Sequence, residues 1–165
     1  SIKKGIKEST GEYIVIHDPD LEYLAEDIWP VLDHMIEQKA AMALGSRLSK
    51  GKIHTQYISN YLAVVFLSKL TGLLYSSKLT DTGTAMKIFQ GSALRSLNLV
   101  SNGFDLDFEL VVRILRTGHN ITEYPINYFP RSTEEGKKIK TIDGLKALKA
   151  ILRDRFIPKK SLLLK

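Results

Sequence analysis

Cysteine is absent from the 165-residue sequence, which excludes disulfide bonds and thiolate metal sites. No apolar run reaches the roughly 18–20 residues that a membrane-spanning helix needs, and no signal-peptide pattern opens the chain. Internal repeats and low-complexity segments are also missing. With 44% hydrophobic and 25% charged residues, the composition is that of an ordinary soluble globular domain with a sizeable core.

Most of the chain has no excess of positive charge. Residues 1–130 hold 13 Lys and Arg against 14 Asp and Glu, a balance of −1, whereas residues 131–165 hold 11 against 4, a balance of +7. The net charge of +6 therefore arises in the last fifth of the chain. Such a segment suits a phosphate-bearing ligand, an anionic membrane surface or nucleic acid, and it equally fits a solvated tail.

Apolar periodicity predicts strands that alternate with helices. The expected strands are 13–16, 41–47, 84–89 and 120–129; the expected helices are 2–9, 25–38, 57–76, 107–117 and one from about residue 141. The apolar run 13–16 is of the type buried on both faces of a parallel sheet, and Pro125 places the last strand at a sheet edge. The alternation predicts an α/β fold with a mainly parallel sheet, whose ligands collect at the carboxyl ends of strands.

The segment "HDPDLEY" places three carboxylates directly after the first predicted strand: Asp18, Asp20 and Glu22. In D-x-D on an extended backbone both side chains leave the same face and can share a hard divalent cation such as Mg²⁺ or Mn²⁺. Aspartate and proline also favour turns, so the motif alone fits a capped turn as well as a metal site.

Two further strand ends carry charged residues. "GSR" places Arg47 after the second predicted strand, and "LTDTGTAMKIF" places Asp81 between two threonines before the third, with Lys87 six residues on. A lone aspartate in such a setting is also common as a turn residue. In "GFDLDFEL", Asp105, Asp107 and Glu109 lie at a helix start, a placement that favourable interaction with the helix dipole explains.

A basic loop precedes the last predicted helix. In "RSTEEGKKIKT", Arg131, Lys137 and Lys138 surround a glycine. Arginine forks and lysine ammonium groups at such a turn can clamp a phosphate, and the same residues also fit a surface loop.

In their order along the chain, "GEYIVIHDPDLEY", "GSR", "LTDTGTAMKIF" and "GFDLDFELVVRILRTGHNITEYPINYFPRSTEEGKKIKTIDGLKAL" resemble the family 2 glycosyltransferases. The branch that they resemble most is the dolichol- or polyprenyl-phosphate sugar synthases, and the likeness runs from Ile2 to about Arg155. It implies a GT-A fold, an NDP-sugar donor, a polyprenyl-phosphate acceptor, Mg²⁺ or Mn²⁺, and inversion at the anomeric carbon. It also implies a cytoplasmic enzyme in peripheral contact with the membrane face, without a nucleic-acid partner.

Carried over by position, the resemblance assigns a role to each acidic residue of interest. Asp18, Asp20 and Glu22 match the D-x-D-x-Q/E motif that binds the metal and the donor diphosphate. Asp81 matches the acidic residue proposed as a base, or as an orienting carboxylate, near the acceptor.

The basic residues that match groups around the lipid phosphate and the donor diphosphate are Arg47, Arg131, Lys137 and Lys138. Because the acceptor is already a phosphate, it needs little deprotonation at neutral pH. Positioning and charge neutralisation are therefore expected to outweigh base catalysis.

The family begins with a strand–helix–strand unit that holds the nucleotide base and ribose, and nothing of this unit precedes Ser1. We expect residues 1–130 to be the C-terminal portion of a GT-A domain, N-terminally truncated, and residues 131–165 to complete its acceptor and membrane side. We also expect this piece not to transfer sugar alone; measurable transfer from an NDP-sugar would contradict that.

Other functions remain open at this stage. One is a family 2 glycosyltransferase with a non-prenyl acceptor. Another is a non-enzymatic anion- or nucleic-acid-binding domain, with steep salt dependence and no need of metal, although its basic segment offers only Phe156 to stack on bases. Phosphatases of the haloacid-dehalogenase type also place D-x-D after a strand, usually followed by Gly-Thr, where this chain has Leu21-Glu22. The largely apolar helix 57–76 fits core packing or a membrane interface.

Overall fold

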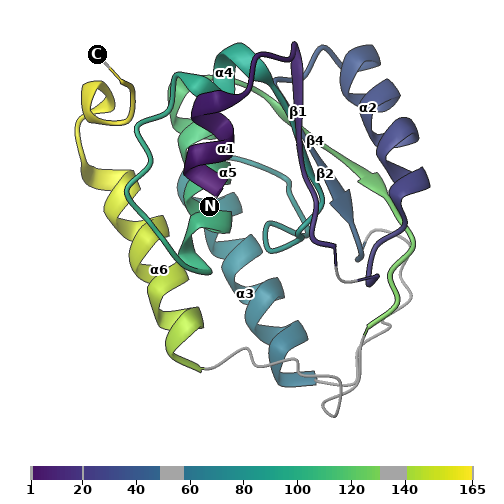
Figure 1. Ribbon diagram of the computed structural model, residues 1–165. Coiled ribbons are helices and arrows are strands. Elements are labelled where there is room, and N and C mark those ends of the chain that lie inside the picture. The colour runs from purple at the N-terminus through teal and green to yellow at the C-terminus, as the bar shows by residue number, and fades with distance from the viewer. Residues whose placement is uncertain (1, 20, 49–57, 131–140, 165) are drawn as a thin grey trace.

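The computed structural model describes residues 2–19, 21–48, 58–130 and 141–164, and its strands form a four-stranded sheet between layers of helices (Figure 1). The strands are β1 (Tyr13–Ile16), β2 (Met42–Ser46), β3 (Lys87–Gln90) and β4 (Ile121–Pro125), in the order β1-β3-β2-β4. The helices are α1 (Ile2–Glu8), α2 (Ile28–Glu37), α3 (Ile58–Tyr75), α4 (Gly91–Arg95), α5 (Asp105–Thr117) and α6 (Thr141–Phe156), with short 3₁₀ segments at Ala25–Asp27 and Lys159–Ser161.

A hydrophobic core lies on each face of the sheet. On one face, Val31 and Met35 of α2 pack against β2, β3 and the start of the chain after β4. On the other face, α1, α4 and α5 pack against the sheet, with Leu110 of α5 near Phe89 of β3 in one cluster. Figure 1 shows this division, with α2 on one side of the sheet and α5 and α6 on the other. A further core joins α3, α5 and α6.

The sheet is mixed rather than mainly parallel. β2 and β4 are parallel, whereas β3 runs antiparallel to both β1 and β2. The chain leaves β2 at Ser46 and re-enters the sheet at Lys87 from the same end, where the Thr84 hydroxyl donates to the Gly45 carbonyl at 2.7 Å. A helical connection gives parallel strands only when it returns the chain to the opposite end of the sheet. The α/β fold class is confirmed, and the expected strand direction is corrected.

The edges of the described sheet are β4 and β1. The edge position predicted for β4 from Pro125 is confirmed. β1 is not buried on both faces as its apolar run predicted: none of its four residues is fully buried, and Val15 is 38% exposed. The limits of α5 agree with the sequence: Gly118 ends the helix with a φ of 93°, a left-handed conformation that glycine adopts without steric cost.

Helix α6 is attached to α5 by a buried ion network. Arg113 Nε lies 2.6 Å from Asp154 Oδ2, and Arg113 Nη2 lies 2.7 Å from Glu109 Oε1. Arg153 contacts the same two carboxylates, at 2.6 Å from Asp154 and 3.0 Å from Glu109. Glu109 also accepts hydrogen bonds from the backbone N–H groups of residues 100–101. The helix-dipole explanation of Glu109 is therefore incomplete, and α6 belongs to the same folded unit as the sheet.

Candidate functional site

Four segments that are distant in sequence meet at one end of the sheet. They are residues 17–19 and 21–23 after β1, Arg47 after β2, the loop 80–86 before β3, and residues 126–128 after β4. Because β3 is antiparallel to β1 and β2, its start lies near their carboxyl ends: Lys87 pairs with Ile16 of β1 and with Leu44 of β2. This end of the sheet therefore collects the acidic turn and "GSR", as predicted for the carboxyl ends of strands. It also collects "TDTGT", which precedes β3 and lies here because β3 is antiparallel to its neighbours.

Arg47 and Asp81 form a two-pronged ion pair at this end of the sheet. The Nε and Nη2 groups of Arg47 donate to the two Asp81 oxygens at 2.8 and 2.7 Å, and the Arg47 backbone N–H donates to Asp81 Oδ2 at 3.0 Å. Asp81 is fully buried, while the Arg47 side chain stays 16% exposed. Burial opposes the charge on Arg47, but Asp81 outweighs it and raises the pKa of the guanidinium. The pair thus presents a fixed cation at the surface.

Two tyrosines enclose this guanidinium. Arg47 Nη1 donates to the Tyr23 hydroxyl at 3.3 Å, and the Arg47 Cζ lies 5.2 Å from the Tyr128 ring centroid, within cation–π range. The Tyr23 hydroxyl also accepts the backbone N–H of Ala85 at 3.2 Å. Burial raises the pKa of Tyr23 to about 12, so the hydroxyl stays neutral at physiological pH. The tyrosines therefore fix the direction of the Arg47 side chain.

The loop that carries Asp81 is held by Glu123 of β4. The Glu123 carboxylate accepts the backbone N–H groups of Thr80 and Asp81, each at 2.8 Å, and the Thr80 hydroxyl at 2.8 Å. Burial raises the pKa of Glu123, and the backbone hydrogen bonds partly oppose that rise. Glu123 thus sets the position of Asp81 without contacting Arg47 in any hydrogen bond described here.

The described carboxylates of "HDPDLEY" differ in their exposure to solvent. Asp18 is exposed, whereas Glu22 is buried and its Oε2 accepts the Tyr128 hydroxyl at 2.9 Å. Asp20 lies outside the described residues, as do the predicted phosphate-binding residues Arg131, Lys137 and Lys138. Within the described ranges, no three His, Asp or Glu side chains gather in a group that could hold a metal.

Several residues of this site had no role assigned from the sequence. Tyr23, Glu123 and Tyr128 are brought to Arg47 or to the Asp81 loop by the fold. For Glu123 and Tyr128 the available signal was the polar residues within "NITEYPINYF", and for Tyr23 it was its place at the end of "HDPDLEY". Lys87 is fully buried, and its ammonium donates to the Thr84 carbonyl and, at 2.8 Å, to Asp107. A lysine inside an apolar strand was the signal for that contact.

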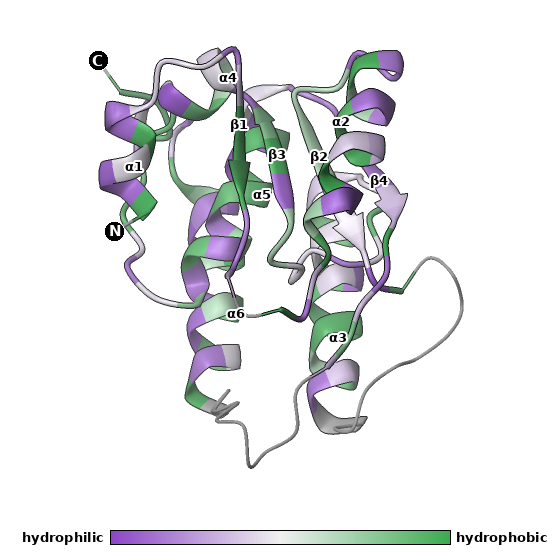
Figure 2. Ribbon diagram, turned by 45° about the vertical axis from the view of Figure 1, so that its right-hand side comes forward, coloured by the Kyte–Doolittle hydropathy of each residue, from purple (hydrophilic) through white to green (hydrophobic). Residues whose placement is uncertain are grey.

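Helices α3 and α6 expose apolar side chains beyond the sheet end. On α3 these are Leu62, Phe66 and Leu73, which are 57–80% exposed, and on α6 they include Leu145 and Phe156, at 57% and 79%. Figure 2 shows hydrophobic residues recurring along both helices. No helix of the described chain is both long and apolar enough to span a bilayer.

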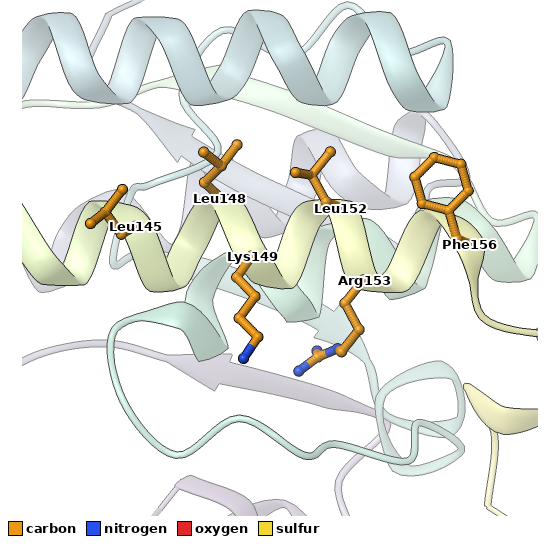
Figure 3. Close-up of a pocket in the computed structure, with 6 residues that line it drawn as sticks. All are labelled: Leu145, Leu148, Lys149, Leu152, Arg153 and Phe156. Carbon is orange, nitrogen blue, oxygen red and sulfur yellow. The ribbon is translucent and has the colours of Figure 1, made fainter.

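A shallow groove of about 420 Å³ runs along α6, lined by Leu145, Leu148, Lys149, Leu152, Arg153 and Phe156. Figure 3 shows Leu148 and Leu152 on one side of the helix and Lys149 and Arg153 on the other. The groove therefore combines an apolar wall with basic side chains.

Known proteins resemble the chain in sequence and in fold. The low-salt glycan biosynthesis hexosyltransferase Agl6 of Haloferax volcanii is 28% identical over 131 residues, covering 75% of the chain and 30% of the relative. The dolichyl-phosphate hexose transferase of Haloferax volcanii is 29% identical over 121 residues, covering 73% of the chain and 52% of the relative. The chain thus spans about half, or less, of these relatives.

The fold is similar to that of glucosyl-3-phosphoglycerate synthase from Mycobacterium tuberculosis, solved in complex with phosphoglyceric acid. The TM-score is 0.70 at 13% sequence identity, over 95% of this chain and 54% of that one. This likeness confirms the predicted GT-A-like fold. Residues 1–97, more than half of the chain, match the sequence model described as Glycosyl transferase family 2. The chain therefore belongs to glycosyl transferase family 2.

Proposed function

We propose that this chain is part of an enzyme that transfers a hexose from an NDP-sugar to a polyprenyl phosphate of the dolichol type, with inversion and with the help of a divalent metal. The observation that carries the proposal is the buried Arg47–Asp81 pair beside the acidic turn at the strand ends. The names of the two Haloferax relatives support a hexose as the transferred group, and one of them supports a dolichyl phosphate acceptor.

The residues after β1 fit a hard cation in part. Asp18 offers an exposed carboxylate, and the Nε2 atom of the neighbouring His17 is buried without a hydrogen-bond partner among the described residues. Asp18 together with Asp20 would hold Mg²⁺ or Mn²⁺. When bound, the metal would neutralise charge on the donor diphosphate.

In this proposal, Asp81 orients rather than deprotonates. Both of its carboxylate oxygens accept hydrogen bonds from Arg47, and the side chain is fully buried. A phosphate acceptor is already an anion at neutral pH, so the reaction requires charge neutralisation more than a base. Arg47, held in one direction and kept charged by Asp81, is suited to bind a phosphate or the developing diphosphate.

The apolar stripes of α3 and α6 would place the site at a membrane face, where a polyprenyl chain is available. The exposed Phe66 and Phe156 offer apolar area, and Lys69 and Lys149 offer charge for anionic headgroups. Arg153 is less available for this purpose because it contacts Glu109 and Asp154. Peripheral contact at the cytoplasmic side is therefore part of the proposal.

The test uses the full-length protein, NDP-sugars, Mg²⁺ or Mn²⁺, and either dolichyl phosphate or a water-soluble phosphate acceptor. We expect transfer to the lipid phosphate and metal-dependent binding of nucleoside diphosphates. Asp20→Ala should weaken that binding by about tenfold or more, since a ligand carboxylate is lost. Asp33→Ala, an exposed aspartate on α2, is the matched control. Transfer to the soluble acceptor alone would replace the prenyl assignment, and unchanged binding in Asp20→Ala would contradict the metal turn.

A further inference from the structure

The backbone at Leu21 separates Glu22 from the D-x-D aspartates. Leu21 has a φ of 60°, in the left-handed region that non-glycine residues rarely adopt. Side chains two positions apart leave the same face only along an extended backbone. The reversal at Leu21 exposes its own side chain to 86% and turns Glu22, at 4% exposure, into the protein. Glu22 therefore does not continue the face that Asp18 begins.

Glu22 contacts the chain after β4 on its buried side. Its carboxylate accepts the Tyr128 hydroxyl at 2.9 Å, and its backbone carbonyl accepts the N–H of Phe129 at 2.9 Å. The next residue, Tyr23, forms an antiparallel bridge with Tyr128, and their ring centroids lie 5.3 Å apart. The acidic turn and residues 128–129 are thus joined by side-chain and backbone contacts together.

The contact continues from Tyr128 to the buried ion pair. The Tyr128 ring lies beneath the Arg47 guanidinium, and Arg47 in turn holds both oxygens of Asp81. Because Glu22 accepts a hydrogen bond from the Tyr128 hydroxyl, it fixes the ring on which Arg47 rests. A rotation of this ring would remove the cation–π contact and leave the guanidinium held by Asp81 and Tyr23 among the contacts described.

We propose that Glu22 is a positioning residue and not a metal ligand: through Tyr128 it holds Arg47 in place and joins the D-x-D turn to the Arg47–Asp81 pair. The inference rests on the proposed function, in which Arg47, paired with Asp81, binds a phosphate. It changes the assignment made from the D-x-D-x-Q/E spacing, which gave Glu22 to the metal. It also makes the alignment of Arg47 depend on the conformation of the acidic turn.

The first arm of the test measures Mn²⁺ affinity of the full-length protein by electron paramagnetic resonance of free Mn²⁺, alone and with UDP or GDP. Glu22→Gln keeps an oxygen that can accept the tyrosine proton, and we expect its Mn²⁺ affinity to stay within about twofold of the parent. Asp20→Asn should lose about tenfold or more. A loss in Glu22→Gln as large as that in Asp20→Asn would overturn the proposal.

The second arm measures transfer kinetics in Tyr128→Phe, Glu22→Ala and the double variant. Each single change should lower kcat about tenfold with a smaller change in donor KM, and the double variant should be no slower than either single one. Glu22→Gln should retain most of the kcat. Losses that multiply in the double variant would overturn the coupling. If Glu22→Ala does not fold, Glu22→Leu, which keeps most of the side-chain volume and removes the hydrogen-bond acceptor, replaces it in the same comparison.

The two arms also separate this proposal from the proposed function. Mn²⁺ affinity unchanged in Asp20→Asn would refute the metal turn, while non-additive losses at Glu22 and Tyr128 would still support the positioning role. The opposite result is a loss of Mn²⁺ affinity in Asp20→Asn together with kcat losses at Glu22 and Tyr128 that multiply. That result would support the metal turn and overturn the link between Glu22 and Arg47.

Discussion

Two buried arginine–aspartate pairs in this protein use the same two-pronged chemistry in different surroundings. Arg113 pairs with Asp154 between α5 and α6, where both side chains are at most 1% exposed. Arg47 pairs with Asp81 at the end of the sheet, where the arginine keeps 16% of its side chain exposed. An enclosed pair can join parts of the fold, whereas a pair with an open cationic side can also meet an anion.

The neighbours of each pair sharpen this difference. Arg113 shares its carboxylates with Arg153, and Glu109 adds a second acid, so two cations and two anions balance within the α5–α6 network. Around Arg47 the single described carboxylate partner is Asp81, and the other contacts are two tyrosines, which direct the guanidinium without adding negative charge. The two regions are therefore expected to respond differently to substitution: one mainly in stability, the other mainly in activity.

The largest expected effect on stability is that of Arg113→Met. The change leaves Asp154 and Glu109 buried with reduced compensation, and breaking a buried pair in this way costs about 3–5 kcal/mol. Urea denaturation would measure the free energy of unfolding, with the exposed Arg155→Met as control. A loss below about 1 kcal/mol would show that the network is not what attaches α6.

Arg47→Lys tests the other pair. Lysine keeps the charge but cannot form the two-pronged contact with Asp81, so we expect kcat of the full-length enzyme to fall about 100-fold. Unfolding free energy should fall by about 1–3 kcal/mol, less than for Arg113→Met. If transfer persisted at the parental rate while stability fell as much as in Arg113→Met, the two pairs would have the same structural role.

Phe156→Ser moves the comparison to the surface. Phe156 is 79% exposed, so its loss should change the unfolding free energy by no more than about 0.5 kcal/mol. Binding to vesicles that contain anionic lipid should weaken about tenfold, because a phenyl group no longer enters the interface. Trp29→Ser on α2, 69% exposed on the opposite side of the sheet, is the matched control. Equal loss in both variants would argue against a membrane face at α3 and α6.

The smallest effect concerns the pH dependence set by Glu123. Since burial raises its pKa in the folded state, folding favours the protonated carboxyl, and this contribution is lost as pH rises from the ordinary glutamate value through the raised one. The free energy of unfolding should therefore decline over that window. The decline is about 1.4 kcal/mol for each unit by which the pKa of Glu123 is higher in the folded state than in the unfolded state. Glu123→Gln should remove the decline. Urea midpoints measured across that window would check it, and a variant with the parental slope would contradict it.

The sequence predicted the elements of this fold better than their directions. Gly118 and Pro125 fixed a helix end and an edge strand through local backbone chemistry, and both predictions are confirmed. The direction of β3 depended on where the segment 80–86 is held, by hydrogen bonds to Gly45 and Glu123 that no local pattern encodes. Helix α4 was not anticipated, because its five residues are too few for apolar periodicity to register.

The sequence identified several residues of the candidate site but not the contacts between them. Strand-end position selected Asp18 and Arg47, and the two flanking threonines drew attention to Asp81, yet the pairing of Arg47 with Asp81 spans 34 positions. The inward turn of Glu22 follows from the left-handed backbone at Leu21, a residue type that gives no signal of such a conformation. Arg131, Lys137 and Lys138 lie outside the described residues, so their phosphate-binding role stays a prediction.

The meeting of four distant segments at one sheet end has a consequence for how the protein folds. The contacts that define this end join residues 24, 34 and 106 positions apart. Contacts of such high sequence separation form late, since the loops between them must close first. During synthesis, Arg47 and Asp81 can pair before Tyr128 has been translated, but the ring beneath the guanidinium cannot be placed until β4 has docked beside β2. Binding competence should therefore appear in a nascent chain only after the hydrophobic core around the sheet is in place.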